Sequence, residues 1–186
     1  GFGPSSAGIL SDIRPSIDGL CGKTLGLFGF GAIGRSMVPK ARGFGMRVIA
    51  CDPYVDNAAV ASADVRLVDL ETLLAESDFI SIHAALTDET RGIFSREAFS
   101  RMKSTSCLIN TARGGFINES DLYDALSGDQ ISMAALDVLG TEPPAEVNRL
   151  MALDNFVCTG HLAFFSPQAL ATQWRRPVDE VLRVLN

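Results

Sequence analysis

The segment "LGLFGFGAIGRS" (residues 25–36) decides the fold. Its apolar run ends at Gly29 and is followed by Gly31 and Gly34, so the three glycines have the spacing G-x-G-x-x-G. The first glycine of such a motif permits a tight turn, the second lets a pyrophosphate approach the backbone, and the third lets a helix pack on the strand. The helix N-terminus then offers free N–H groups to the phosphates. The segment predicts a strand, a phosphate-binding turn and a helix.

Asp52 supports this interpretation. It follows the next apolar run, "RVIAC" (47–51), and stands 18 residues after Gly34. A carboxylate there accepts hydrogen bonds from a ribose 2′-hydroxyl and repels a 2′-phosphate. The alternative, in which Asp52 only opens the turn "DPY", does not explain its agreement with the glycines. We therefore predict NAD as the cofactor, in preference to NADP.

Short apolar runs alternate with helix-forming stretches along most of the chain. The strand candidates are "TLGLFG" (24–29), "RVIAC" (47–51), "FISIHA" (79–84), "CLINTA" (107–112), "ISMAALDV" (131–138) and "FVCTG" (156–160). Helices are expected over about 32–43, 69–76, 95–102 and 119–127, with Asp69, Ser95 and Asn118 as N-caps and Gly128 just beyond the last helix. Six strands of this kind predict an α/β fold: a doubly wound, Rossmann-type, mainly parallel sheet with helices on both faces.

The two ends of the chain depart from this alternation. Residues 1–19 mix Gly, Ser and Pro with scattered apolar residues and are predicted to be a linker or N-terminal arm, which leaves 20–186 as the dinucleotide-binding domain. A last helix is expected over about 167–185. Its apolar stripe consists of Leu170, Trp174, Val178, Leu182 and Leu185. Pro177 in its middle should kink this helix or split it in two.

Polar residues follow most of the predicted strands. Ligands of open parallel sheets bind beyond the carboxyl ends of the strands, so side chains at these positions are candidates for function. They are Asp52, His83, Arg113, Asp137 and His161. A purely structural histidine would not require polar residues at the ends of the other strands, so we interpret His161 as functional. For His83, a cofactor-lining or core-edge role is as well supported as a catalytic one.

Two charged residues complete the predicted catalytic set. Arg113 precedes Gly114 and Gly115, which let the backbone turn sharply and leave the planar guanidinium to bind a carboxylate. The alternative is an arginine that caps a loop or pairs with the following helix. Glu142 lies in "LGTEPP" (139–144), a loop stiffened by two prolines, where it could hydrogen-bond His161 and favour the charged imidazole.

Composition argues against several other functions. The net charge is −6 and no block of Lys and Arg occurs, so neither nucleic acids nor anionic membranes are expected as partners. No apolar run approaches the ~18 residues of a membrane span, and no signal-peptide pattern is present, so we expect a cytoplasmic protein. The four cysteines are far apart and contain no C-x-x-C pair, which predicts buried reduced thiols and no metal site.

Five motifs in order resemble one known family. They are "GFGAIG" (29–34), "HAALTDETRGIF" (83–94), "NTARGG" (110–115), "LDVLGTEPP" (136–144) and "TGHLAFFS" (159–166). Together they are similar to the NAD-binding domain of the D-isomer-specific 2-hydroxyacid dehydrogenases, from about residue 22 to the final helix. The resemblance implies an NAD-dependent oxidoreductase that interconverts a D-2-hydroxy acid and a 2-oxo acid by hydride transfer. It also implies a homodimer whose substrate is a small 2-hydroxy or 2-oxo acid.

The resemblance further implies roles for individual residues. Arg113 would bind the substrate carboxylate, His161 would be the acid and base, and Glu142 would orient His161. Asp137 would hold the nicotinamide carboxamide, and Thr87 would line the cofactor site. The residues predicted to bind the cofactor are Gly29, Gly31, Ala32, Ile33, Gly34, Asp52, His83, Thr87, Thr111, Ala112 and Asp137.

The chain departs from the family pattern in two ways. The family usually has proline before the catalytic histidine, where this chain has Gly160, and glycine loosens the backbone that aims the imidazole. Family members also carry about a hundred residues before this region, which help to build a substrate domain, and we expect that domain to be absent from this chain.

Two other groups of proteins have similar motifs but different functions. The C-terminal-binding corepressors have the same Arg, Glu and His set but act as NAD(H)-sensing modules that recruit partners. Formate dehydrogenases are less similar, because they pair their histidine with glutamine where this chain has Glu142.

Overall fold

The computed structural model describes residues 19–55, 60, 65–144 and 148–185. A seven-stranded sheet forms its centre, and every neighbouring pair of strands is parallel. The strands are β1 (Thr24–Phe28), β2 (Arg47–Cys51), β3 (Arg66–Leu67), β4 (Phe79–Ile82), β5 (Cys107–Asn110), β6 (Met133–Leu136) and β7 (Phe156–Cys158). The predicted doubly wound α/β fold is therefore confirmed.

The spatial order of the strands is β3-β2-β1-β4-β5-β6-β7. Chain order reverses between β1 and β4, which pair in register from Leu25 with Phe79 to Phe28 with Ile82. A crevice forms at such a reversal, beyond the carboxyl ends of the two strands. The expectation of six strands was wrong by one, because β3 has only two residues and is too short to show an apolar pattern.

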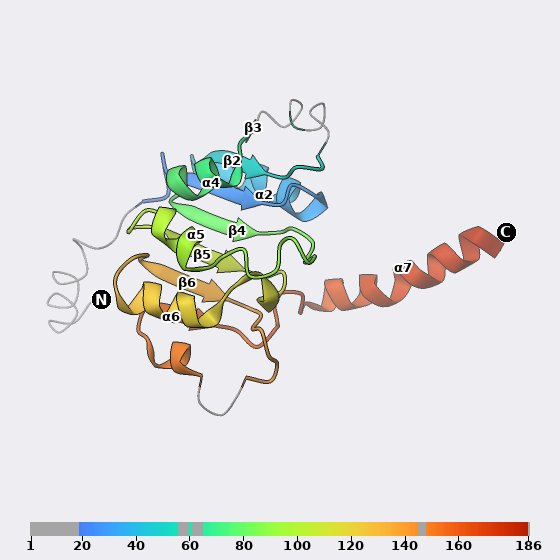
Figure 1. The fold of residues 1–186 in the computed structure, drawn as a ribbon. Coiled ribbons are helices and arrows are strands. Elements are labelled where there is room, and N and C mark those ends of the chain that lie inside the picture. Colours follow the sequence, from blue (N-terminus) through green and yellow to red (C-terminus); the bar gives the residue numbers. More distant parts are fainter. Residues whose placement is uncertain (1–18, 56–59, 61–64, 145–147, 186) are drawn as a thin grey trace, which may run out of the picture.

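Helices cover both faces of the sheet (Figure 1). The helices and helical turns are α2 (Ala32–Gly43), α4 (Leu70–Glu76), α5 (Arg96–Arg101), η2 (Gly114–Phe116), α6 (Glu119–Ser127), η3 (Arg149–Ala152) and α7 (Pro167–Leu185). Val38 and Ala41 of α2 pack on Leu25 and Leu27, whereas α4, α5 and α6 pack in a row on the opposite face. Alternate residues of β1 therefore belong to different cores, as the two-residue period of a strand requires.

An aromatic cluster anchors the loops at the carboxyl edge. Phe28, at the end of β1, meets the rings of Phe94 and Phe116 edge to face, with centroids 5.5 and 6.0 Å away. Phe94 and Phe116 are fully buried. Because Phe116 closes the turn that begins after Arg113, this packing fixes the loop on which Arg113 stands.

Two of the three predicted helix caps are confirmed as side-chain caps. Asp69 accepts a hydrogen bond from Thr72 N (2.8 Å), and Asn118 accepts from the N–H groups of residues 120 and 121. Ser95 occupies the N-cap position of α5, but its side chain makes no capping bond. The first N–H of α5, on Arg96, instead donates to Asp121 of α6 at 3.0 Å, a long-range partner that local sequence does not reveal.

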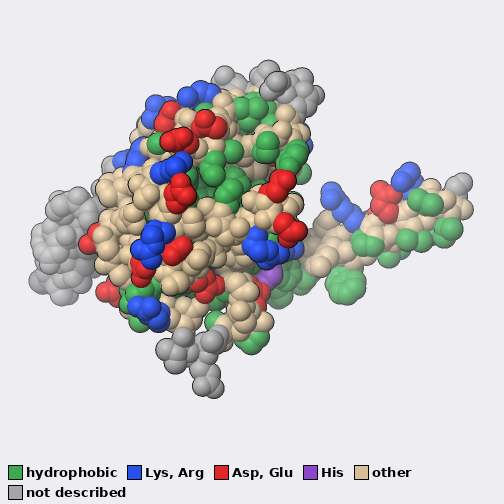
Figure 2. Space-filling model, in the orientation of Figure 1, with side chains coloured by type: hydrophobic (Ala, Val, Ile, Leu, Met, Phe, Trp, Pro, Cys, Tyr) green, Lys and Arg blue, Asp and Glu red, His purple; other side chains and the backbone are tan. Residues whose placement is uncertain are grey.

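The last helix is one continuous helix that extends away from the sheet (Figure 1). Of the two effects expected of Pro177, a kink or a split, the split does not occur. The carbonyl group that proline leaves without a partner belongs to Gln173, which is exposed and can bind water. None of the described residues of α7 is buried. Its predicted apolar stripe is therefore open (Figure 2). Trp174 on this stripe is 77% exposed.

Other expectations concern the arm, the cysteines and the membrane. The predicted N-terminal arm, apart from Gly19, lies outside the described residues. All four cysteines are free, as expected of reduced thiols, but Cys21 is exposed and the other three are half-buried, so the expectation that they are buried was wrong. Residues at strand ends and sheet edges are more exposed to solvent than an apolar sequence run suggests. Within the described residues, no helix is both long and apolar enough to span a membrane.

Candidate active and cofactor site

The glycine turn between β1 and α2 is closely packed. Gly29 has φ +98°, and a Cβ built there would lie 2.3 Å from the backbone nitrogen of Ala84. A Cβ on Gly34 would lie 2.4 Å from the carbonyl oxygen of Gly29. The first and third glycines are therefore required by the backbone, one for its left-handed conformation and the other for the approach of α2 to β1.

Gly31 has a different role from the other two glycines. A Cβ there would meet nothing within 4 Å, so packing does not require glycine. Gly31 is the N-cap of α2, no side chain caps this helix, and its first turn contains no acidic residue. The N–H groups of Ala32 and Ile33 thus stand at an uncapped, positive helix end beside open space. This arrangement fits a pyrophosphate, which would come against Gly31.

Asp52 lines a cavity next to the glycine turn. Its Oδ2 accepts a hydrogen bond from Phe30 N (2.8 Å), and its Oδ1 accepts from Tyr54 N (3.0 Å). The cavity has a volume of about 680 Å³, enough for an adenosine, and Thr87 is among its lining residues. Its apolar wall consists of Phe28, Val68, Leu70, Ala84, Ala85 and Ile93. The carboxylate therefore stands where a ribose next to the glycine turn would need an acceptor.

His83 lies behind the glycine turn. Its backbone N–H donates to the Phe28 carbonyl (2.7 Å), and its Nε2 is 2.9 Å from the hydroxyl of Ser81. Burial lowers the pKa of His83, because the low-dielectric surroundings disfavour the imidazolium. A neutral, half-buried imidazole at this position favours the cofactor-lining interpretation over proton transfer.

Arg113 is exposed on a loop that Asn110 holds. Asn110 is fully buried at the end of β5; its Nδ2 donates to the Arg113 carbonyl (2.8 Å) and its Oδ1 accepts from Ala112 N (2.9 Å). The guanidinium of Arg113 donates to the carbonyl of Ala112 at 2.6 Å. Thr111 is exposed in the same turn. Sequence reasoning missed Asn110, although its position at a strand end beside Arg113 was a usable signal.

The Arg113 loop lies directly against the loop that carries Glu142. A Cβ on Gly114 would be 1.9 Å from the carbonyl carbon of Leu139, so the two backbones touch. Glu119, the first residue of α6, holds the loop that carries Glu142. Its carboxylate accepts hydrogen bonds from Gly140 N (2.7 Å) and from the Asn148 side chain (3.1 Å). Glu119 is a positioning residue that sequence reasoning missed, because its partner is 21 residues away.

Glu142 and His161 are brought together as predicted. His161 Nδ1 lies 2.7 Å from Glu142 Oε2, while Glu142 Oε1 accepts from Leu139 N at 2.9 Å. The hydrogen bond with His161, followed by that from Leu139, lowers the pKa of Glu142 below its ordinary value. The carboxylate is therefore ionised at neutral pH and fixed at both oxygens.

His161 has an uncommon backbone conformation, with φ +58°. Its N–H donates to the carbonyl oxygens of Asp137 (2.8 Å) and Thr159 (3.0 Å). The preceding Gly160 has no positive φ, and a Cβ there would meet nothing within 4 Å. The glycine in place of the family's proline is thus not demanded by the backbone at that position.

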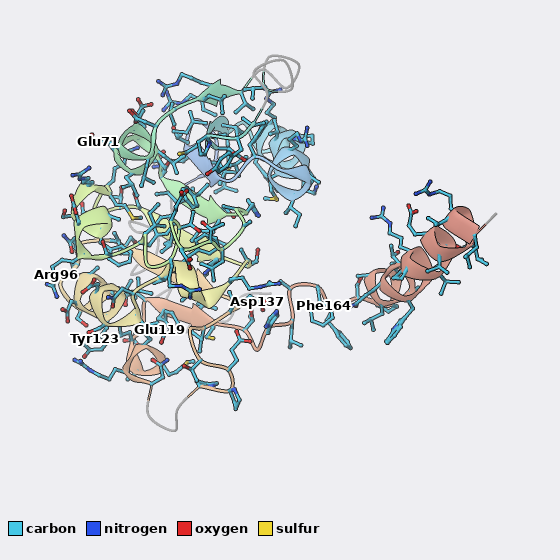
Figure 3. The ribbon with its side chains drawn as sticks, turned by 45° about the vertical axis from the view of Figure 1, so that its right-hand side comes forward. Glu71, Arg96, Glu119, Tyr123, Asp137 and Phe164 are labelled. Carbon is cyan, nitrogen blue, oxygen red and sulfur yellow. The ribbon has the colours of Figure 1, made fainter. Side chains whose placement is uncertain are left out.

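Asp137 organises the loop that carries His161 (Figure 3). Its buried carboxylate accepts from the Thr159 hydroxyl (2.5 Å), Leu162 N (2.8 Å) and Ala163 N (2.9 Å). Burial by itself raises the pKa of Asp137, but these hydrogen bonds outweigh it and hold the pKa below the ordinary value. Both of its oxygens accept hydrogen bonds from the protein. Asp137 therefore has a structural role that does not depend on a bound nicotinamide.

The site residues thus form two groups along one edge of the sheet. Gly29, Asp52 and Thr87 line the larger cavity, and His83 lies behind the glycine turn without lining it. Glu142 and His161 meet at the far end of the edge, beside a smaller cavity of about 380 Å³. Among the described residues, Arg113 makes no hydrogen bond or ion pair with either of them. Those residues also contain no cluster of His, Cys, Asp and Glu that could hold a metal.

Comparisons with known proteins agree with this geometry. Residues 7–163 match the family model described as D-isomer specific 2-hydroxyacid dehydrogenase, NAD binding domain. A hydroxypyruvate reductase of Thermotoga maritima is 45% identical over 168 residues, which are 89% of this chain and 54% of that protein.

Solved structures agree as well. The D-isomer specific 2-hydroxyacid dehydrogenase of Lactobacillus delbrueckii ssp. bulgaricus, in its NAD complexed form, superposes with a TM-score of 0.79 at 26% identity, over 88% of this chain and 53% of that one. An acyclic imino acid reductase, Bsp5, in complex with NADPH and D-Arg, gives 0.83 at 28% identity, over 97% and 60%. The chain spans little more than half the length of these proteins. It belongs to the D-isomer-specific 2-hydroxyacid dehydrogenase family and corresponds to that family's NAD-binding domain.

Proposed function

We propose that the chain is the cofactor-binding part of an NAD-dependent oxidoreductase that interconverts a D-2-hydroxy acid and a 2-oxo acid. The observation that carries the proposal is the Glu142–His161 pair, 2.7 Å apart at the edge of the sheet that also bears the glycine turn. An ionised carboxylate on Nδ1 of an imidazole is the arrangement that a positioned acid and base needs. Family membership supports the redox chemistry.

Each residue has a part in this reaction. NADH, when bound, supplies the hydride, and the uncapped N-terminus of α2 and Asp52 would hold its pyrophosphate and ribose. Arg113 would bind the carboxylate of the oxo acid with its guanidinium. Because Glu142 accepts the Nδ1 proton of His161, Nε2 is the atom that would give a proton to the substrate oxygen or take it back.

The test is carried out on a full-length protein that carries this chain, since the chain spans about half of its relatives. His161→Ala should lower kcat for 2-oxo acid reduction by roughly 10²- to 10⁴-fold, the usual contribution of a positioned acid and base. The Kd for NADH should hardly change. Asp154→Ala, which removes an exposed carboxylate from another loop, serves as the control. Turnover of His161→Ala within about threefold of wild type would contradict the proposal.

A second candidate is an NAD(H)-sensing module that recruits a partner. The observation that favours it is the group of exposed apolar side chains after His161, namely Leu162, Phe164 and Phe165. Capture of a partner that depends on NADH, without turnover of any 2-oxo acid by the full-length protein, would support this module over the enzyme.

Assembly and location are also proposals. A homodimer is supported by the resemblance to the family, and the mass of the chain in solution scattering tests it: a monomer at tens of micromolar would contradict it. A cytoplasmic location and the absence of nucleic-acid partners stay predictions from composition.

A further inference from the structure

The cavity beside the glycine turn is acidic. Three carboxylates line it, from Asp52, Asp69 and Glu89, and none of its lining residues within the described chain is Lys or Arg. A cofactor with a 2′-phosphate brings about two negative charges to this region and normally meets an arginine there. Related folds accept either cofactor, since one neighbour is solved with NAD and another with NADPH.

Backbone N–H groups donate hydrogen bonds to the carboxylate of Asp52. Each of its oxygens already accepts a hydrogen bond, one from Phe30 N at 2.8 Å and one from Tyr54 N at 3.0 Å. These N–H dipoles offset part of the negative field that Asp52 projects into the cavity. Its remaining lone pairs can still accept from a hydroxyl, so recognition of a free ribose is retained. Rejection of a phosphate then depends more strongly on the other charges nearby.

Tyr54 fixes Glu89 by a hydrogen bond, and both residues line the same cavity. Its ring is 83% exposed, and its hydroxyl donates to Glu89 Oε2 at 3.2 Å. The two residues come from different loops, 35 positions apart, so this bond joins the ends of β2 and β4. The hydrogen bond with Glu89 also raises the pKa of Tyr54, which keeps the hydroxyl a donor at neutral pH. Tyr54 thus bridges the two carboxylates, because its N–H donates to Asp52 and its hydroxyl donates to Glu89.

Asp69 places a third carboxylate in the wall. Its Oδ1 accepts from Thr72 N at 2.8 Å and caps α4, which fixes its position. The hydrogen bonds with the side chain and then the backbone of Thr72 hold the pKa of Asp69 below its ordinary value, so this group too is ionised at neutral pH.

We propose that Glu89, held by Tyr54, is a second residue that selects NADH over NADPH, and that Asp69 adds to it. The charge of the whole cavity, and not Asp52 alone, excludes a 2′-phosphate. This inference rests on the proposed function only in taking the cavity as the adenosine end of the cofactor site. It implies that Asp52→Ala narrows the preference for NADH without abolishing it.

The test compares the Kd values of NADH and NADPH for the chain, by calorimetry at low and high salt. Glu89→Gln should lower the Kd of NADPH about fivefold, the effect of removing one charge at roughly 8 Å from a dianion in water. The Kd of NADH should stay within about twofold, and the gain for NADPH should shrink at about 0.5 M salt, where screening is short-ranged. Asp69→Asn, which keeps the helix cap, should act in the same direction.

Glu97→Gln is the matched control, because Glu97 is an exposed glutamate that pairs with Arg101 on α5 and does not line the cavity. Tyr54→Phe removes the hydroxyl that holds Glu89, so it should reduce the preference for NADH over NADPH.

The outcomes separate this inference from the proposed function. A wild-type chain that binds neither nucleotide would overturn both. A chain that binds NADH but whose Glu89→Gln and Asp69→Asn variants match Glu97→Gln in NADPH affinity would overturn this inference alone. Equal weakening of NADH and NADPH by Glu89→Gln would assign Glu89 to general binding and would also overturn it.

Discussion

Replacing Asp137 by alanine will show how firmly the loop that carries His161 is held. Asp137 is only 5% exposed, and its carboxylate accepts three hydrogen bonds, from the Thr159 hydroxyl and from the N–H groups of Leu162 and Ala163. The alanine variant loses all three bonds. The backbone bond of His161 remains, because it goes to the carbonyl oxygen of residue 137.

The size of the effect follows from these contacts. A hydrogen bond to a charged group contributes about 1.5–3 kcal/mol, so three of them set an upper limit of roughly 4.5–9 kcal/mol. Leu162 and Ala163 are exposed, and water can solvate their N–H groups in the variant, which removes much of the desolvation penalty. We expect a loss of about 3 kcal/mol in the free energy of unfolding. For a domain of this size that corresponds to a fall in Tm of roughly 6–12 °C.

The assay is equilibrium unfolding in urea, followed by far-ultraviolet circular dichroism. Asp154→Ala is the control, because it removes an exposed carboxylate and should change stability by less than about 0.5 kcal/mol. Hydrogen exchange at residues 159–163 should also accelerate in Asp137→Ala but not in the control. If the Asp137 variant loses less than about 1 kcal/mol, water replaces the three bonds without cost and the reasoning is refuted.

Three further predictions use the same unfolding assay. Gly114→Ala should destabilise the chain by roughly 2 kcal/mol or more, because its Cβ would lie 1.9 Å from the carbonyl carbon of Leu139; an unchanged midpoint would contradict the contact between the two loops. Gly160→Ala should stabilise it by about 0.5 kcal/mol, since the added Cβ meets nothing within 4 Å and the backbone has no positive φ, and a loss of stability would show that the loop needs glycine. The pKa of Asp137 is lowered in the folded state, so its contribution is complete above the unfolded value near 4 and disappears as the pH falls through the folded value. Stability of the wild type should therefore fall more steeply below pH ~4 than that of Asp137→Ala, and parallel curves would refute the shift.

Much of the fold could be predicted because parallel strands buried on both faces appear as continuous apolar runs. The run "RVIAC" became β2 with the same bounds, Arg47–Cys51. The two-residue strand β3 offers too few positions for any pattern, and its pairing depends on β2 being in place. The cap of α5 failed for a similar reason, since the partner of Arg96 N is Asp121 on another helix.

In the candidate site, too, features set by local sequence could be predicted, whereas a feature set by a distant partner could not. Strand ends can be located from local pattern, and parallel topology brings them to one edge, so the approach of Glu142 to His161 could be expected. Asn110 bonds only residues two and three positions further along its own loop, so its place at a strand end could have revealed it. Glu119 supports a loop by bonding Gly140, which is 21 residues further along the chain. The role of Glu119 depends on a tertiary contact, which a single sequence does not specify.

The open helix α7 also gives the chain a built-in optical reporter. Trp174 is the only tryptophan of the chain, and its indole is 77% exposed on the stripe of α7 that no described residue buries. All tryptophan emission therefore comes from this exposed helix, and it should resemble that of an indole in water. A blue shift in that emission would reveal when another surface covers the stripe, whether a second copy or another protein, and would do so without a label.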